Sequence, residues 1–385
     1  MYTLLLIAGA LSLAAWLYLL LAYGRFWMVR RLLPPAAASA DVAGTIAVVI
    51  PARNEAEVIG KAVGSLLGQS YADSLHIFVV DDNSSDATVE ATRRAAAIAL
   101  RPDAVAIVPG RPLPDGWTGK LWAMEQGVEQ ALRLKPEFLL LTDADIEHSP
   151  ANVSTLVNLA KDGQYDLVSF MVKLHCDSLA EKLLIPAFVF FFFMLYPPEW
   201  IRDPRRRTAG AAGGCMLIRP AALERAGGLA AIRQEIIDDC ALARVVKRSG
   251  GRTWLGVSAE THSLRRYCSF GEIERMIART AFNQLKHSAW LLLGAVLGML
   301  LIYVLPLALL ASGSRPLAAL GGAACLMMVV AYLPMVRFYR LSLLWPLTLP
   351  VSAAFYTVAT IHSALKYWCG RGGEWKGRAQ DVARS

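Results

Sequence analysis

Charged residues are scarce in this sequence. Only 18% of the 385 residues are charged, whereas 55% are hydrophobic and the mean hydropathy is +0.41. Such a chain is too apolar for one ordinary soluble domain, yet its middle part remains polar. The composition therefore indicates a soluble domain fixed to a membrane.

Cysteines are few and lie far apart. None of the six forms a CxxC pair or has the spacing of a metal finger, which excludes the common zinc modules and the dithiol redox motif. They are expected to be reduced thiols of a cytoplasmic protein. Internal repeats are also missing.

A basic groove interleaved with aromatic residues is missing too, although the formal net charge is +8 and the pI about 9.2. The basic residues cluster beside apolar segments, so an anionic lipid surface is the expected partner and nucleic acid is not.

The N-terminal segment contains no charge. Residues 1–23 are long enough to cross a bilayer, and Arg25, Arg30 and Arg31 follow them. A cleavable signal peptide has its basic region first, so residues 1–24 are predicted to be an uncleaved transmembrane anchor. A linker over 25–44 would follow, and the arginines place the next domain on the cytoplasmic side.

The C-terminal region, residues 287–365, holds three more apolar stretches, 289–311, 317–336 and 341–365. Three crossings would export the basic tail, residues 366–385, although its charge favours the cytoplasmic side. One stretch is therefore expected to be re-entrant or interfacial, with "WPLTLP" as the candidate. The prediction is a multi-pass protein of the inner (plasma) membrane.

Apolar runs alternate with helical patterns in residues 45–286. Strands are predicted at 45–52, 75–82, 105–110 and 138–145, with helices beginning near Glu55, Asp86, Gly119 and Pro150. Continuous apolar strands are typical of a parallel sheet covered on both faces. Ligands bind beyond the carboxyl ends of such strands, where "PARNE", "DDNSSD" and "TDAD" fall.

The stretch "FLLLTDADIEHSP" ends an apolar strand with two carboxylates, Asp143 and Asp145. Close carboxylates repel one another, and a divalent cation, Mg²⁺ or Mn²⁺, would stabilise them together with substrate phosphates. The alternative is an ordinary turn in which Asp145 caps the next helix.

Four motifs occur in order: "VVIPARNE", "VVDDNSSD", "LLLTDAD" and "IIDDCALA". Together they resemble glycosyltransferase family 2 over about residues 45–280. The resemblance implies an α/β GT-A fold, with a Rossmann-like, mostly parallel sheet, between N-terminal and C-terminal transmembrane helices. It also implies an inverting transfer from a nucleotide sugar.

The resemblance assigns roles to particular residues. Asp239 would be the catalytic base and Asp238 its neighbour; the alternative is a pair of acids at a helix start. Asp145 and Asp143 would hold the metal, and Asp82 would read a uracil ring, which indicates a UDP-sugar. The remaining residues expected to bind the nucleotide sugar are Pro51, Ala52, Arg53, Glu55, Lys120, Gly213, Gly214 and Arg279.

The sequence also departs from the family pattern. Processive members carry Gln-x-x-Arg-Trp after the base, whereas this chain has Met276 and Thr280 around Arg279. The missing aromatic favours a single transfer over polymer synthesis, and Arg275 or Arg279 remains a candidate for the diphosphate.

The segment 183–207 contains an apolar run of about 13 residues, too short to span a bilayer. Flanking Trp200 and arginines favour an interfacial segment, through which a lipid acceptor would enter; a buried core helix is the alternative. The whole arrangement resembles hopene-associated glycosyltransferases of hopanoid biosynthesis and, more distantly, ceramide glucosyltransferases.

Other functions stay open at this point. They are a nucleotidyl- or phosphoglycosyl-type transferase, a polyprenyl-phosphate or polysaccharide glycosyltransferase, and a non-catalytic membrane scaffold. The late acid pair separates the glycosyltransferase from the first of these, and a scaffold would have no need for both acid pairs.

Overall fold

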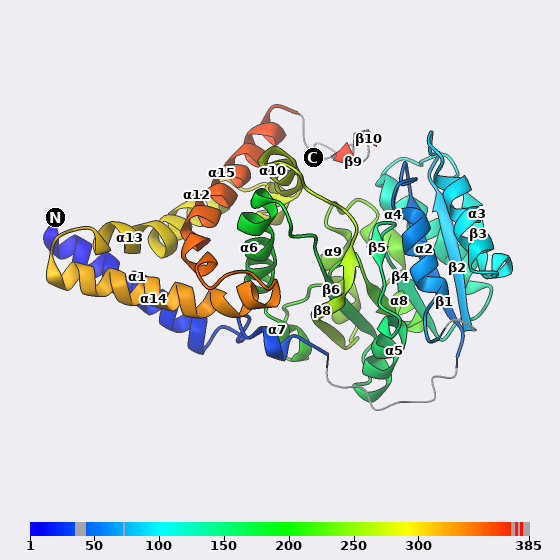
Figure 1. The fold of residues 1–385 in the computed structure, drawn as a ribbon, viewed down its shortest axis with the longest axis horizontal. Coiled ribbons are helices and arrows are strands. Elements are labelled where there is room, and N and C mark those ends of the chain that lie inside the picture. Colours follow the sequence, from blue (N-terminus) through cyan, green and yellow to red (C-terminus); the bar gives the residue numbers. More distant parts are fainter. Residues whose placement is uncertain (35–43, 72–73, 371–373, 376–377, 380–385) are drawn as a thin grey trace. The chain divides into compact units, whose positions relative to one another are not determined.

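A computed structural model describes residues 1–34, 44–71, 74–370, 374–375 and 378–379 (Figure 1). The chain forms two compact units, which are described separately. The helical unit comprises Met1–Arg31, Cys176–Glu199 and Arg266–Gly372. The sheet unit comprises Leu32–His175, Trp200–Arg265 and Gly373–Ser385.

The sheet unit is built on eight strands in the order β3-β2-β1-β4-β7-β6-β8-β5. The strands are β1 (Ile46–Ala52), β2 (Leu75–Asp81), β3 (Val105–Pro109), β4 (Phe138–Leu141), β5 (Ile146–Glu147), β6 (Leu167–Lys173), β7 (Met216–Ile218) and β8 (Thr253–Ser263). Neighbours from β3 to β4 are parallel, as are β6 and β8, whereas β7 is antiparallel to both β4 and β6 and β5 is antiparallel to β8. The predicted α/β fold with a mostly parallel sheet is confirmed.

Helices pack on both faces of this sheet (Figure 1). They are α2 (Ile59–Leu67), α3 (Thr88–Ile98), α4 (Gly119–Leu132), α5 (Asn152–Asp162), α8 (Pro220–Arg225) and α9 (Asp238–Arg248), with 3-10 turns η3 (Pro102–Ala104) and η4 (Leu229–Ile232). Helices α2 and α3 begin two to four residues later than predicted, because the preceding residues form loops held by side-chain hydrogen bonds.

Strand β1 explains why its sequence is continuously apolar. Val48 and Ile50 belong to the core cluster that contains α2 and α5 side chains, whereas Ala47 and Val49 belong to the cluster that contains α4 and α9 side chains. Every residue of β1 is buried. A strand covered on both faces must be apolar at every position, as in parallel sheets generally.

The helical unit contains the apolar ends of the chain. Its long helices are α1 (Tyr2–Leu21), α6 (Leu179–Leu195), α14 (Arg315–Phe338) and α15 (Leu349–Trp368). Its shorter elements are η1 (Val29–Arg31), α10 (Phe270–Ala278), α11 (Ala281–Gln284), α12 (Ala289–Met299), the π-helical η5 (Leu300–Val304), α13 (Leu305–Leu310) and η6 (Trp345–Thr348). Helix α7 (Pro198–Arg202) and the two-residue strands β9 (Glu374–Trp375) and β10 (Arg378–Ala379) complete the described elements.

Within the described residues, four helices are long and apolar enough to cross a membrane: Tyr2–Leu21, Leu179–Arg202, Ala289–Leu310 and Arg315–Phe338. The first, third and fourth fall where the sequence predicts spans. Helix α15 is not among the four, and the "WPLTLP" segment forms η6 and the start of α15. The expected linker residues 35–43 and most of the tail beyond residue 370 lie outside the described residues.

The segment around 183–207 requires a correction, because it was predicted to be too short to span. Helix α6 begins at Leu179, ahead of the apolar run, because Ser178 and Glu181 form a capping box. Phe190 and Phe193 are buried inside the helical unit. Their burial fits the buried-helix alternative, while the interfacial placement of the segment stays a prediction.

The two units divide the chain differently from the predicted boundaries. The sequence predicts one domain over 45–286, whereas Cys176–Glu199 and the residues after Arg265 belong to the helical unit. Leu32 belongs to the sheet unit, where its carbonyl accepts a hydrogen bond from the Val257 N–H.

Candidate functional site

The ends of β1 and β2 form one side of the candidate site. Pro51 and Ala52 are the last residues of β1 and are buried. Arg53 follows them, donates a hydrogen bond to the Asp82 carbonyl and lies 3.6 Å from Asp82 Oδ2. Asp82 is 1% exposed, so Arg53 offsets the cost of burying its negative charge.

The backbone around Glu55 is fixed by the loop that follows β2. The Asn54 N–H donates to Ser84 Oγ at 3.0 Å, and the Glu55 N–H donates to Thr88 Oγ1 at 2.9 Å. Asn54 has a φ of +52°, which asparagine tolerates better than most residues. The loop therefore presents the Glu55 side chain from a defined position.

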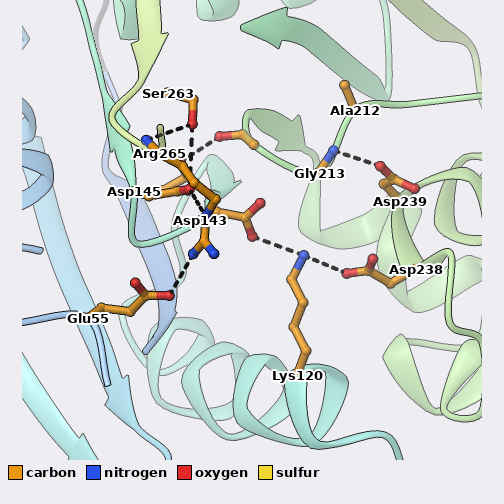
Figure 2. Close-up of polar contacts among 12 residues, drawn as sticks. Glu55, Lys120, Asp143, Asp145, Ala212, Gly213, Asp238, Asp239, Ser263 and Arg265 are labelled. Atoms are coloured by element: carbon orange, nitrogen blue, oxygen red, sulfur yellow. Dashed lines mark hydrogen bonds and ion pairs between the residues drawn. The ribbon is translucent and has the colours of Figure 1, made fainter. Parts of the chain in front are cut away.

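Lys120 joins two acids that come from distant parts of the sequence (Figure 2). It lies in the first turn of α4, and its Nζ lies 2.9 Å from Asp143 Oδ1 and 3.1 Å from Asp238 Oδ2. Burial lowers the pKa of Lys120, but the carboxylates of Asp143 and Asp238 outweigh it and raise the pKa above its ordinary value. Lys120 is therefore a cation that holds the loop after β4 next to the start of α9.

Asp239 is held by backbone N–H groups. Its Oδ2 accepts from the Gly213 N–H at 2.8 Å and its Oδ1 from the Cys240 N–H at 2.6 Å. Burial raises the pKa of Asp239 to about 6, and the neighbouring Asp238 carboxylate adds to the rise. A carboxylate with this pKa is ionised at neutral pH and is a stronger base than an ordinary aspartate.

Both members of the acid pair occupy the first turn of α9. The helix dipole favours negative charge there, so the structural interpretation of the pair as acids at a helix start is compatible with a catalytic one. Their contacts differ, because Asp238 pairs with Lys120 whereas Asp239 is bound by Gly213.

The glycines before β7 approach the acids closely. A Cβ at Gly213 would lie 3.4 Å from both Asp239 Oδ2 and Lys120 Nζ, at the limit of ordinary contact. Gly214 offers its carbonyl to the Thr142 hydroxyl at 2.7 Å. In this structure the glycines shape the acid cluster, and their expected contact with a sugar stays a prediction.

Arg265 links Asp145 to Glu55, on the other side of Asp143 from Lys120 (Figure 2). Its Nε donates to Asp145 Oδ2 at 3.0 Å, and its Nη2 donates to Glu55 Oε1 at 3.3 Å. The pairing of β5 with the end of β8 brings Arg265 here, since Ile146 faces Ser263 in that ladder. The loop after β4 is thereby tied to the loop after β1.

The residues fit a divalent cation that is completed by substrate. Among the described residues no group of three or more His, Cys, Asp or Glu side chains forms a metal site. Mg²⁺ and Mn²⁺ in nucleotide sites often take only one or two carboxylates, with phosphates and water as the other ligands. Burial raises the pKa of Asp143, and repulsion by the neighbouring Asp145 carboxylate raises it further. A divalent cation would relieve that repulsion.

The structure gathers most of the predicted residues in the sheet unit. Arg279 instead ends α10 in the helical unit, so its predicted contact with the diphosphate stays a prediction. Sequence reasoning missed Arg265, which only the β5–β8 pairing brings to Asp145. It also assigned no role to His148, although this residue lies in the stretch that holds Asp143 and Asp145. The only local signal was a histidine directly before Ser149 and Pro150.

Nearly half of the sequence matches the model of a known family. Residues 47–227 match glycosyl transferase family 2. An uncharacterized protein of Methanocaldococcus jannaschii is 33% identical over 122 residues, which are 32% of this chain and 44% of that protein. The chain thus spans less than half the length of this curated relative.

Solved structures extend the likeness to the fold. A mannosyltransferase from Pyrobaculum calidifontis, in complex with GDP-Man and Mn²⁺, aligns with a TM-score of 0.57 at 20% identity, over 95% of this chain and 99% of that chain. The glucosyl-3-phosphoglycerate synthase of Mycobacterium tuberculosis aligns with a TM-score of 0.39 at 18% identity, over 63% of this chain and 81% of that chain. Only the first of these is similar enough to show a shared fold. Residues 47–227 therefore match the glycosyl transferase family 2 domain, and the chain has a GT-A-like fold.

Proposed function

We propose that this protein is a glycosyltransferase, which transfers one sugar from a nucleoside diphosphate sugar to a lipid acceptor at a membrane, with inversion at the anomeric carbon. The observation that carries the proposal is the Lys120 bridge between Asp143 and Asp238. It brings the acids expected at the diphosphate next to the acid pair expected at the acceptor, as an in-line displacement requires.

The donor is bound, in this proposal, across the carboxyl ends of β1, β2 and β4. Asp82 and Arg53 contact the nucleobase of the donor. Glu55 and Lys120 border its diphosphate. Ligands of open α/β sheets bind at this edge, which supports the assignment. The nucleotide is UDP if Asp82 reads uracil, and GDP-mannose belongs in any donor panel because the Pyrobaculum enzyme was solved with it.

Asp239 accepts the proton of the acceptor hydroxyl. As the proton leaves, the acceptor oxygen forms a bond to the anomeric carbon from the face opposite the nucleotide, and the bond to the diphosphate oxygen breaks. The pair of electrons goes to the departing nucleoside diphosphate. A pKa of about 6 suits this role, because Asp239 is ionised at neutral pH while remaining basic.

Asp143 and Asp145 would hold Mg²⁺ or Mn²⁺, which would supply positive charge for the departing diphosphate. Asp238 orients the site through its ion pair with Lys120. Arg265 would compete with such a cation for the Asp145 carboxylate, because its Nε donates to Asp145 Oδ2.

A lipid acceptor is supported by the four helices that are long and apolar enough to span a membrane within the described chain. The sheet unit would face the cytoplasm, where nucleotide sugars are made, and the arginines after α1 favour that orientation. A hopanoid is one acceptor class to test, on the resemblance given by the sequence.

The test is transfer by membranes that contain the protein. Membranes are incubated with a panel of UDP- and GDP-sugars, and lipid extracts are analysed by mass spectrometry for a single added hexose. Membranes with Asp239→Asn give the background, and exposed Asp103→Asn is the matched control for the same chemical change. Transfer to water or to soluble sugars, with no glycolipid from any donor, would overturn the lipid assignment.

Metal dependence is tested by donor binding rather than turnover. Nucleotide affinity is measured by titration calorimetry with and without Mn²⁺ for the wild type, Asp145→Ala and Asp103→Ala. We expect Mn²⁺ to strengthen binding to the wild type and the control only. An equal response of Asp145→Ala would remove Asp145 from the metal site.

A further inference from the structure

A buried polar network lies directly behind the acid cluster. It joins Thr142, which follows β4, to His148, to Asn152 at the start of α5 and to Thr261 in β8. These four side chains are between 0% and 3% exposed. Apolar residues would fill this space without the cost of burying polar groups. The presence of four polar side chains therefore indicates a role beyond packing.

The hydrogen bonds have one consistent set of directions. The Thr142 hydroxyl donates its only proton to the Gly214 carbonyl at 2.7 Å, so it must accept from His148 Nε2 at 3.0 Å. Nε2 therefore carries the ring proton.

The other ring nitrogen is then an acceptor. Nδ1 of His148 accepts from Asn152 Nδ2 at 2.9 Å, and Asn152 Oδ1 accepts from the Thr261 hydroxyl at 2.9 Å. Only the neutral tautomer with a proton on Nε2 matches every partner, because a proton on Nδ1 would face another N–H. Burial supports the same state, since it lowers the pKa of His148 to about 3.

The backbone that carries the His148 ring is held by hydrogen bonds as well. The His148 N–H donates to Ser65 Oγ of α2 at 2.9 Å, and Gln69 of the same sheet unit donates to the Ser149 carbonyl at 2.7 Å. His148 therefore transmits the position of α2 to the Thr142 hydroxyl.

The Thr142 hydroxyl lies where the two sides of the site separate. The ladder between β4 and β7 ends with Leu141 facing Met216. Beyond this pair, the segment after β4 continues into Asp143. The segment before β7 contains Gly213, whose N–H donates to Asp239. The bond from Thr142 to Gly214 is thus a side-chain tie across the point of separation.

We propose that His148 is a positioning residue, which aims the Thr142 hydroxyl at Gly214 and so sets the distance between the metal-side acids and the catalytic base. The inference rests on the proposed roles of Asp143, Asp145 and Asp239. It explains why a polar network is buried where an apolar core would also pack, since a directional bond fixes geometry that apolar contact leaves adjustable.

Two substitutions of His148 separate positioning from stability. A glutamine amide reaches the place of Nε2 and keeps an N–H toward Thr142, whereas an asparagine reaches only the place of Nδ1 and keeps an acceptor for Asn152. His148→Gln leaves one N–H of the buried Asn152 amide without its acceptor, while the amide keeps its contact with Cys215 Sγ, and should lose at least as much thermal stability as His148→Asn.

The rates should follow the opposite order. We expect His148→Asn to lower kcat about 10- to 100-fold with donor affinity within about twofold, because the reacting groups are misplaced and not removed. His148→Gln should recover most of the rate. If kcat instead falls in step with melting temperature in both variants, the network is only structural.

The hydroxyl is tested in the same way. Thr142→Val should lower kcat as His148→Asn does, and Thr142→Ser should restore it. Thr92→Val in α3 is the matched control, because it also removes a buried hydroxyl that donates to a carbonyl, at 2.9 Å. Normal turnover in Thr142→Val would overturn the proposal.

A readout that needs no substrate separates this inference from the proposed function. With ¹⁵N-histidine labelling, the resonances lost in His148→Gln identify the ring among the six histidines. We expect a neutral ring with the proton on Nε2 and no titration between about pH 5 and 8. A proton on Nδ1, or titration in that range, would overturn the network, whether or not a donor and acceptor have been found.

Discussion

The acid cluster has two sides that are built differently. On one side Lys120, with 19% of its side chain exposed, lies between Asp143 and Asp238. On the other side Arg265, with 41% exposed, lies between Asp145 and Glu55. Both cations bridge two carboxylates (Figure 2), and the difference lies in the cations themselves, because the carboxylates next to Arg265 are 13% exposed and those next to Lys120 are 35% and 13% exposed.

The difference in exposure changes what each cation contributes. Electrostatic attraction is stronger where water is excluded, so the Lys120 side should be a fixed part of the fold. The exposed Arg265 side is screened by water, and its pairs are worth little in free energy. The Arg265 side is therefore the one that can rearrange when a metal and a diphosphate arrive.

The largest effect is expected at the Lys120 side, where Asp239 lies next to Asp238. Asp239→Asn should lower kcat by about 10² to 10⁴-fold with little change in donor affinity, because a base acts in the transition state. Asp238→Asn should cost less, since it loses only the pairing with Lys120. Steady-state kinetics on both variants decide the roles, and near-normal turnover of Asp239→Asn would exchange them.

The next effect is on pH dependence. Because burial raises the pKa of Asp239 to about 6, kcat should be constant above this pH and fall about tenfold per unit below it, as the base becomes protonated. The Lys120 ammonium lowers this pKa, so Lys120→Gln should move the midpoint to higher pH. Arg265→Gln is the control from the other side, and an equal shift in both variants would contradict the distinction between the sides.

Stability provides a direct comparison of the two cations. Lys120→Met leaves Asp143 and Asp238, which are 35% and 13% exposed, without their cation and should cost about 2–3 kcal/mol, less than the range for fully buried pairs. Arg265→Met should cost at most about 1 kcal/mol. Thermal melting in detergent measures both, and equal losses would mean that burial does not distinguish the sides.

The smallest effect concerns metal affinity. Arg265→Gln removes a competitor from Asp145 and should tighten Mn²⁺ binding about two- to fivefold, in line with the energy of an exposed ion pair. Electron paramagnetic resonance of free Mn²⁺, without nucleotide, measures it. Weaker binding in Arg265→Gln would show instead that the arginine helps to form the site.

Some elements of the site could be predicted because local sequence determines them. The apolar runs of β1, β2 and β4 predict buried strands, and the polar residues that follow them fall at one sheet edge, where Arg53, Asp82 and Asp143 lie. Helix α6 begins earlier than its apolar run predicts, because the capping box at Ser178 precedes that run. Turn and capping residues set boundaries more finely than hydropathy does.

The sequence by itself determined the class of fold, the apolar ends and the identity of the acids, since these follow from periodicity, composition and short motifs. Only the tertiary structure decided which charges meet. Lys120 is more than a hundred positions from Asp238, and Arg265 as far from Asp145, so no local pattern relates them. Their pairing depends on strand order and register in the sheet, which bring distant strand ends to one edge and exclude water there.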